Sequence, residues 1–165
     1  MKFIELFDMQ RALDKFIEET QNINRDVFNE KGLALLVEWG ELANETRCFK
    51  FWSTKGPSEK SVILEEFVDS IHFMLSLGYM RNFTLEEWPV VEKEADLTQG
   101  FIDATQTVLT FLQQQTESNY KAIWQQYSLI AYNLGFTVED IIEAYKAKNE
   151  KNYKNKERRR DNSDY

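Results

Sequence analysis

Two pairs of carboxylates, each spaced three residues apart within apolar sequence, are the residues of this chain best suited to chemistry. Glu38 and Glu41 lie in EWGELANETRCFKFW at residues 38–52, and Glu66 and Asp69 lie in LEEFVDSIHFMLSLG at residues 64–78. A spacing of three places both acids of a pair on the same side of a helix. If both segments are helical, the four carboxylates can converge on one place.

Projection at about 100° per residue places these acids at or within apolar faces. In the first segment the acids lie beside a stripe that contains Trp39, and in the second they share a face with Phe73 and Leu77. A carboxylate that is buried without compensation costs several kcal/mol, so a group of them requires cations or strong donors. Ligands that offer only oxygen favour Mg²⁺, with Mn²⁺ as the alternative ion, over zinc.

The pairs and the single histidine also have simpler interpretations. One Glu-x-x-Glu pair on a helix is usually a solvated face, but two pairs with 24 residues between Glu41 and Glu66 are harder to explain in that way. Di-iron bundles require two Glu-x-x-His motifs, and the chain has only one histidine, His72. His72 follows Asp69 by three, so it is either an orienting residue behind the metal ligands or a packed histidine.

Helical periodicity continues along most of the chain and predicts the elements that must position these acids. Ser58 and Thr137 are predicted to cap helix N-termini, Gly135 a C-terminus, and Thr84 with Glu87 matches a capping box that Pro89 would cut short. No segment shows the alternation of a strand. The predicted fold is an all-α bundle of six to seven helices, with helices at residues 3–20, 31–48, 59–79, 97–115, 117–134 and 138 to about 157.

Composition and length limit the classes of protein to which this chain can belong. A chain of 165 residues with 42% hydrophobic residues, 6 Gly and 2 Pro is expected to form one globular helical domain. No apolar run is long enough for a membrane span, and Glu5 and Asp8 interrupt any signal-peptide core, so we expect no membrane partner. The single cysteine, Cys48, cannot form an internal disulfide, which suits a cytoplasmic protein.

Charge is distributed unevenly along the chain. The net charge is −8, but residues 146–165 hold eight basic and four acidic residues, so this end carries +4 and the remainder −12. An acidic body argues against nucleic acid as a partner, because phosphate backbones bind basic surfaces. We expect residues 1–155 to form the domain and residues 156–165 to be a basic tail that is mobile in the free protein.

Five motifs along the chain resemble those of the dimeric all-α dUTPases, which belong with the MazG-like nucleoside triphosphate pyrophosphatases. The two acid pairs carry the wider resemblance. The dUTPase branch is indicated by Phe49-Lys50-Phe51-Trp52, by LFDMQRALDKFI with Gln10 and Asp14 one helical turn apart, and by Tyr145-x-x-Lys148-Asn149-x-x-Asn152. The resemblance extends from residue 6 to about residue 153.

The resemblance implies Mg²⁺-dependent hydrolysis of dUTP to dUMP and pyrophosphate, by attack of metal-activated water on the α-phosphorus. It also implies a homodimer. The metal ligands would be Glu38, Glu41, Glu66 and Asp69, with Glu38 also orienting or deprotonating the water. The base would stack on Trp52 near Phe49 and Lys50, although Trp52 could instead be core. The remaining substrate contacts would be Gln10 and Asp14 at a base or sugar edge, and Lys148, Asn149 and Asn152 at the phosphates.

One departure concerns the C-terminal motif. The family continues KNxxNxxRQxxGY, whereas Asn155 and Lys156 stand here at the positions of the Arg and Gln. Asn155 has no guanidinium group with which to bind a phosphate through two hydrogen bonds, so we expect Arg158 or its neighbour Arg159 to make that contact.

Three alternatives remain open from the sequence. A related pyrophosphatase that acts on dCTP or on several deoxynucleoside triphosphates would need the same four acids. A helical homodimer module without enzymatic activity would carry the acids as structural residues. A protein that binds nucleic acid through its basic tail would show steeply salt-dependent binding to DNA.

Overall fold

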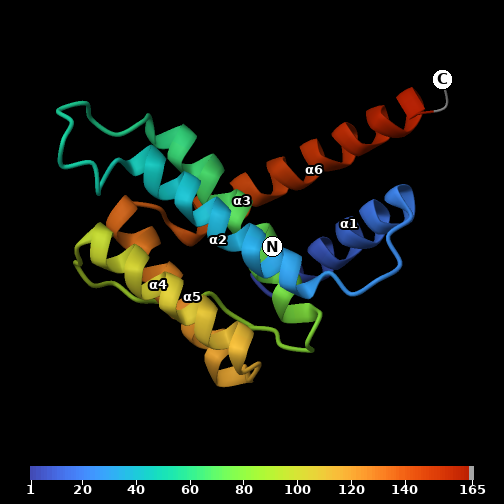
Figure 1. Cartoon of the computed structure of the whole chain (residues 1–165), viewed down its shortest axis with the longest axis horizontal. Helices are drawn as coiled ribbons and strands as arrows, with labels where there is room; N and C mark the ends of the chain where they lie inside the picture. The colour runs from blue at the N-terminus through green and yellow to red at the C-terminus, as the bar shows by residue number, and fades with distance from the viewer. Residues whose placement is uncertain (164–165) are drawn as a thin grey trace.

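Six helices form the protein in a computed structural model, which describes the backbone of residues 1–163 and the side chains of residues 1–158 (Figure 1). No strand occurs within residues 1–163, so the all-α prediction is confirmed. Within these residues, no helix is both long and apolar enough to cross a membrane. The helices are α1 (Glu5–Gln21), α2 (Phe28–Thr46), α3 (Lys60–Tyr79), α4 (Leu97–Gln113), α5 (Glu117–Leu134) and α6 (Val138–Ser163).

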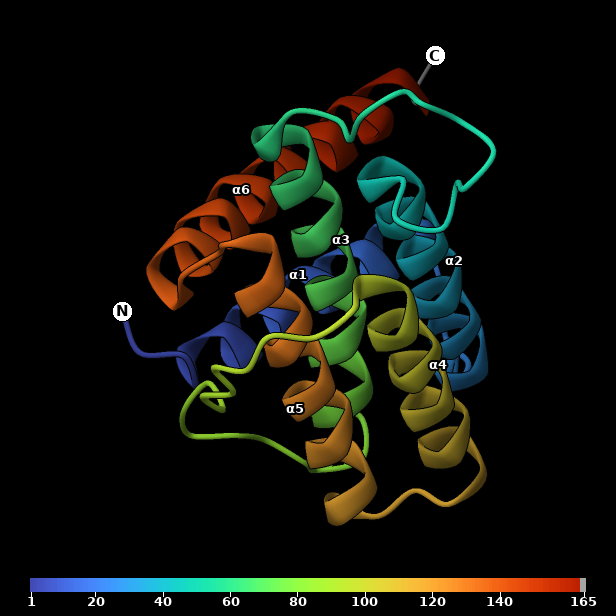
Figure 2. The ribbon, with the colours of Figure 1, turned by 90° about the vertical axis from the view of Figure 1, so that its left-hand side faces the viewer.

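The central helix is α3, which lies in the middle of the bundle in Figure 2 and packs against α1, α2 and α6. Its apolar side chains point in several directions, and most of them are buried. Two tyrosines of α5 bond to its backbone: the Tyr120 hydroxyl donates to the carbonyl of Met74 and the Tyr127 hydroxyl to that of Phe67, each at 2.7 Å. The ring of Tyr127 also stacks on Phe67 with centroids 4.0 Å apart. These contacts hold α3 in place within the core.

Several helix ends follow directly from local sequence. Gly135 adopts a left-handed conformation with φ of 77° and ends α5, as predicted. Thr137 and Asp140 then cap α6 reciprocally, because the Thr137 hydroxyl accepts from the Asp140 amide at 3.1 Å while the Asp140 carboxylate accepts from the Thr137 amide at 3.0 Å. Asp96 and Thr116 cap α4 and α5 by one bond each, because the Asp96 carboxylate accepts from the Gln99 amide and the Thr116 hydroxyl from the Asn119 amide.

Two predicted caps are wrong. Ser58 does not cap α3, because its hydroxyl donates to the carboxylate of Glu45 and so fastens the long loop to the end of α2. Thr84 starts no helix, and residues 84–96 run as an irregular segment. That segment is held against α5 instead, where the Trp88 indole donates to the Ser128 hydroxyl at 2.9 Å.

Candidate active site

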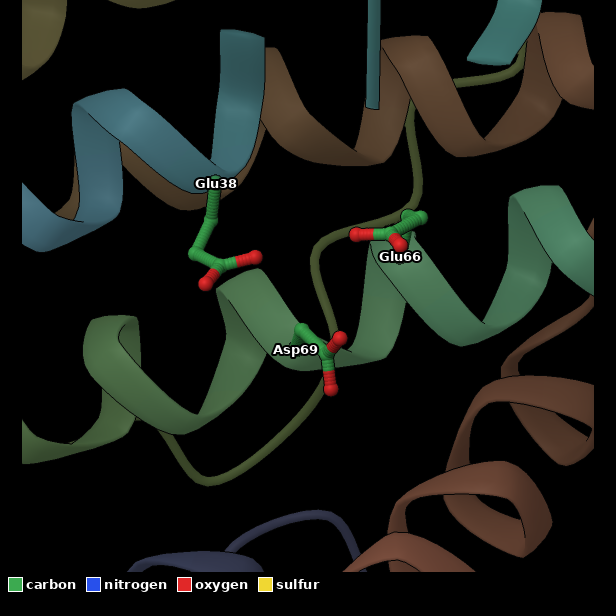
Figure 3. Close-up of side chains that lie close together, drawn as sticks. All are labelled: Glu38, Glu66 and Asp69. Carbon is green, nitrogen blue, oxygen red and sulfur yellow. The ribbon is translucent and has the colours of Figure 1, made fainter. Parts of the chain in front are cut away.

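Three of the four predicted acids converge between α2 and α3. Glu38 extends from α2, while Glu66 and Asp69 extend from successive turns of α3 toward the same space (Figure 3). One oxygen from each of the three carboxylates lies within 4.8 Å of the others. All three side chains are half-buried, so the cluster lies at the edge of the core rather than on an open surface.

The packing of the two helices explains this position. On α2, Leu35 and Trp39 are buried in the core, and Glu38 emerges directly beside that stripe. On α3, Phe67 and Val68 are buried between the two acids in sequence. Since α2 and α3 pack along their length, the acids at the edges of both apolar faces meet where the helices touch.

Burial and mutual repulsion perturb the protonation of these acids. Burial, followed by the charges of Glu41 and Asp69, raises the pKa of Glu38 to about 7. Burial is also the main cause that raises the pKa of Glu66 and that of Asp69, although Lys148 opposes the effect at Asp69. An acidic group with these properties binds protons or cations more strongly than solvated carboxylates do.

Unpartnered carboxylate oxygens show that the site fits a metal ion. Oε2 of Glu38 and Oε2 of Glu66 are buried and have no hydrogen-bond partner in the described part of the chain. Buried polar atoms without partners are uncommon in proteins. Oxygen atoms alone, with neither histidine nitrogen nor cysteine sulfur among the clustered ligands, match the preference of Mg²⁺ and Mn²⁺.

The fourth predicted acid, Glu41, lies at the rim of the cluster. Its side chain is exposed, and its oxygens are not part of the group of three. It is nevertheless close to Glu38, because among the neighbouring charges that of Glu41 raises the pKa of Glu38 the most.

The predicted phosphate-binding residues extend from α6, which runs beside α3 (Figure 2). The Lys148 ammonium group lies 3.0 Å from Oδ1 of Asp69 and 3.3 Å from Oε1 of Glu65. Asn149 is buried, Asn152 is half-buried and Arg158 is exposed. The structure therefore brings Lys148 to the carboxylate cluster, and Arg158 lies further along the same helix.

Gln10 and Asp14 lie inside the protein rather than on an open surface, with exposed fractions of 3% and 7%. The Gln10 amide oxygen accepts from the hydroxyl of Tyr145 at 2.9 Å. Four donors reach the carboxylate of Asp14: Gln10 Nε2 at 2.9 Å, Lys31 Nζ at 3.0 Å, the Tyr79 hydroxyl at 2.7 Å and the Ser76 hydroxyl. Contact of these residues with a base or sugar stays a prediction.

This network contains residues that sequence reasoning missed. Lys31, Ser76 and Tyr79 are 17, 62 and 65 residues away from Asp14. No local pattern links them. The sequence offers only an indirect indication of these partners: a carboxylate at Asp14, on the buried side of a predicted helix, requires hydrogen-bond donors from neighbouring elements.

His72 is buried next to the network and does not bond to the acid cluster. Its ring stacks on Tyr145 with centroids 4.5 Å apart and an interplanar angle of 28°. Neither ring nitrogen has a hydrogen-bond partner among the side chains and backbone that the structure describes, and burial lowers the pKa of His72 to about 4. Its predicted role as an orienting residue behind Asp69 stays a prediction.

The loop between α2 and α3 carries the predicted base-stacking residues. Trp52 is 65% exposed and Phe49 is 39% exposed, so Trp52 is not a core residue. Their rings meet edge to face with centroids 6.0 Å apart, and the Lys50 ammonium group lies 5.9 Å from the centre of the Phe49 ring. Sequence reasoning missed Phe51, whose exposure of 92% is the largest of the exposed large hydrophobic side chains.

The chain is an all-α bundle in which carboxylates from two packed helices converge, with a lysine from a third helix beside them, an arrangement suited to a divalent cation. A family model described as dUTPase matches residues 2–162. The chain therefore belongs to the dUTPase family and is a dUTP diphosphatase, as its motifs predicted. A search of curated proteins finds no match to the chain.

Proposed function

We propose that this dUTPase hydrolyses dUTP between the α and β phosphates, with Mg²⁺ held by Glu38, Glu41, Glu66 and Asp69. The observation that carries the proposal is the group of three carboxylates with two buried, unpartnered oxygens between α2 and α3. When bound there, Mg²⁺ supplies positive charge to the triphosphate and acidifies a water molecule. The products are dUMP and pyrophosphate.

Glu38 is the residue best placed to orient the attacking water and to take up its proton. Burial and the neighbouring acids raise the pKa of Glu38 to about 7 in the metal-free protein, so this carboxylate takes up a proton more readily than a solvated one. A bound divalent cation would lower that pKa, so the assignment rests on the position of Glu38 in the cluster. Its free Oε2 gives it an acceptor that no protein donor among the described residues occupies. Glu66 and Asp69 extend from α3 and would bind the metal ion from the side opposite Glu38.

The substrate is proposed to extend from the loop to α6. Trp52 and Phe49 offer apolar ring surface to the uracil, and Lys50 brings a positive charge beside it. Lys148 is already next to the cluster, so it can reach a phosphate without any movement of its helix. The remaining proposed contacts are Asn149, Asn152 and Arg158 to the phosphates, Gln10 and Asp14 to a base or sugar edge, and His72 behind the metal ligands.

We also propose that the protein is a homodimer. Support comes from apolar side chains exposed on two adjoining helices: Leu33 and Val37 on α2, and Ile102 and Leu109 on α4. Light scattering should give twice the mass of 19.6 kDa that the chain has, and a single mass would contradict the dimer. A cytoplasmic location stays a prediction from the lone Cys48.

Turnover of a nucleotide panel tests the activity. The purified protein is mixed with dUTP, dCTP, dTTP, dATP and dGTP in Mg²⁺, and monophosphate and pyrophosphate are measured separately. We expect dUTP to be preferred, pyrophosphate to be released in equal amount to dUMP, and EDTA to stop the reaction. Preference for dCTP would favour the related pyrophosphatase, and equal rates on purine nucleotides would contradict dUTP specificity.

A further inference from the structure

Lys148 already bonds to a residue that the proposed function assigns to the metal ion. Its ammonium group lies 3.0 Å from Oδ1 of Asp69 and 3.3 Å from Oε1 of Glu65. The Lys148 and Asp69 side chains are only 20% and 21% exposed, so this ion pair is partly shielded from water. Salt therefore screens it less than it screens an ion pair on an open surface.

The three clustered acids differ in what neutralises them. Glu38 and Glu66 each keep a buried oxygen without a partner in the described part of the structure, whereas Asp69 has the Lys148 ammonium group. The positive charge of Lys148 thus neutralises Asp69, one of the three acids, before any ion or substrate binds. A divalent cation at the cluster would compete with that charge for Asp69 and would also repel it.

The surroundings of Lys148 allow its ammonium group to change partner. A shallow groove of about 260 Å³ between α3 and α6 is lined by Lys148 together with Val68, Ala144 and other residues. A lysine side chain is a flexible stem with a compact charged end, so it can turn within such a groove without a change in the core. Glu65 has a second cation nearby, because the Lys151 ammonium group lies 3.6 Å from its Oε1.

We propose that Lys148 is an exchangeable cation of the active site: it neutralises Asp69 in the free enzyme and transfers its charge to the triphosphate when a divalent ion binds Asp69. This inference rests on the proposed function. Its consequence is that Lys148 weakens metal binding in the absence of nucleotide. Nucleotide and metal should therefore strengthen each other's binding by more than their direct attraction provides, because the nucleotide removes the competing charge.

Mn²⁺ binding without nucleotide tests this, since free Mn²⁺ can be measured by electron paramagnetic resonance and no turnover is needed. In Lys148→Met the Mn²⁺ dissociation constant should fall by about threefold to tenfold, the range that loss of a partly shielded ion pair allows. In the same variant the KM for dUTP should rise, because the phosphates lose their cation. The same two changes should follow in Lys148→Gln, which replaces the methionine variant in the test if that variant does not fold.

Lys151→Met is the matched control, because Lys151 lies on the same helix and near the same Glu65 but does not contact Asp69. It should leave both Mn²⁺ affinity and KM near the values of the wild-type protein. The proposal is overturned if Mn²⁺ binds the Lys148 variants no more tightly than the wild type, or if Lys151→Met tightens binding to the same extent. Absence of Mn²⁺ binding in the wild type and in both Lys148 variants would instead overturn the proposed function itself.

Discussion

Glu38 and Asp69 belong to one cluster, but the charges around them differ, and their variants should separate metal binding from stability. Glu38 has no cation beside it, and its pKa is raised to about 7 by burial and by neighbouring acids. Asp69 is paired with Lys148. In EDTA at pH 8, we expect Glu38→Gln to raise the melting temperature, because an unfavourable charge is removed, and Asp69→Asn to raise it less or lower it.

Both variants should bind Mn²⁺ weakly and lose activity by more than about 100-fold, since a ligand matters at least as much as the residues that orient it. Thermal melting with and without Mg²⁺ measures the first effect, and steady-state turnover measures the second. Normal turnover of either variant in Mg²⁺ would show that the substituted residue is not a ligand.

His72 gives a pH dependence whose direction follows from its burial. The pKa of His72 is lowered to about 4, below its ordinary value of 6.5, so the unfolded chain binds the proton more readily than the folded protein does. Between these values stability rises with pH, and it is lost as the pH falls from about 6.5 toward 4. The shift corresponds to a stability difference on the order of 3 kcal/mol across that range.

We expect His72→Gln to show a shallower loss of stability over this pH range than the wild-type protein, whatever its stability at pH 7. Urea unfolding at several pH values in EDTA measures this slope, and the other titrating groups contribute equally to both proteins. Parallel curves for the two proteins would contradict a buried, neutral histidine.

Residue types and spacing were enough to predict the acids, because the period of a helix relates sequence to side-chain direction. Glu38, Glu66 and Asp69 were selected in this way and do converge. The neutralisation of Asp69 by Lys148, which is 79 positions further along the chain, was not predictable, since it depends on how α6 packs on α3.

At the scale of elements, the loop from residue 47 to residue 59 is held by polar bonds and presents its aromatic residues to solvent. The Arg47 guanidinium group donates to the Ser53 hydroxyl at 2.7 Å and to the carbonyl of Lys55 at 3.1 Å. Because Trp52 is 65% exposed, its replacement should leave folding intact. The aromatic surface is therefore available for a ligand.

We expect Trp52→Ala to raise the KM for dUTP by about fivefold to 150-fold, because stacking of a base on an aromatic side chain contributes about 1 to 3 kcal/mol. The melting temperature should change little. Phe51→Ala is a suitable control, since Phe51 is adjacent and even more exposed but is not among the residues proposed to contact the base. An unchanged KM in Trp52→Ala would exclude stacking on this residue.

Helix boundaries were predictable where a cap acts within its own turn and were missed where a side chain bonds elsewhere. Thr137 and Gly135 act locally and were identified correctly. Ser58 has the same kind of side chain as a cap, but its hydroxyl donates a hydrogen bond to the carboxylate of Glu45 on α2 instead. Competition between local and tertiary partners cannot be read from a three-residue pattern.

At the scale of the whole molecule, helix packing brings together polar residues that lie far apart in the sequence. The donors around Asp14 come from α1, α2 and α3, and the hydroxyl of Tyr145 on α6 extends the network to Gln10. Such a network joins four of the six helices around the buried side of α3. The number and order of helices were predictable from periodicity, but this connection required the folded structure.

The molecule is also divided by charge, because residues 146–165 carry +4 and the remainder carries −12. In Figure 1, α6 extends past the other helices toward the C-terminus. The inner part of α6 is anchored, since the ring of Tyr153 packs against Phe16 of α1 with centroids 5.1 Å apart. Arg158 lies beyond this contact and is exposed. Basic charge is thus concentrated on a segment whose removal leaves the anchoring contact in place.

Truncation after Asn155 tests whether the tail binds the triphosphate, as we predict from the replacement of the family's Arg by Asn155. The truncated protein keeps Lys148 and Tyr153, so its melting temperature should stay close to that of the full chain. Its activity on dUTP should fall by at least about tenfold, because a charge-assisted contact to a phosphate contributes about 1.5 to 3 kcal/mol. Replacement of Arg158 alone by Gln should give part of that loss. Steady-state kinetics and a melting curve decide between this role and a solvated basic helix end, which predicts almost no kinetic change: full activity without residues 156–165 would exclude the tail as a phosphate clamp.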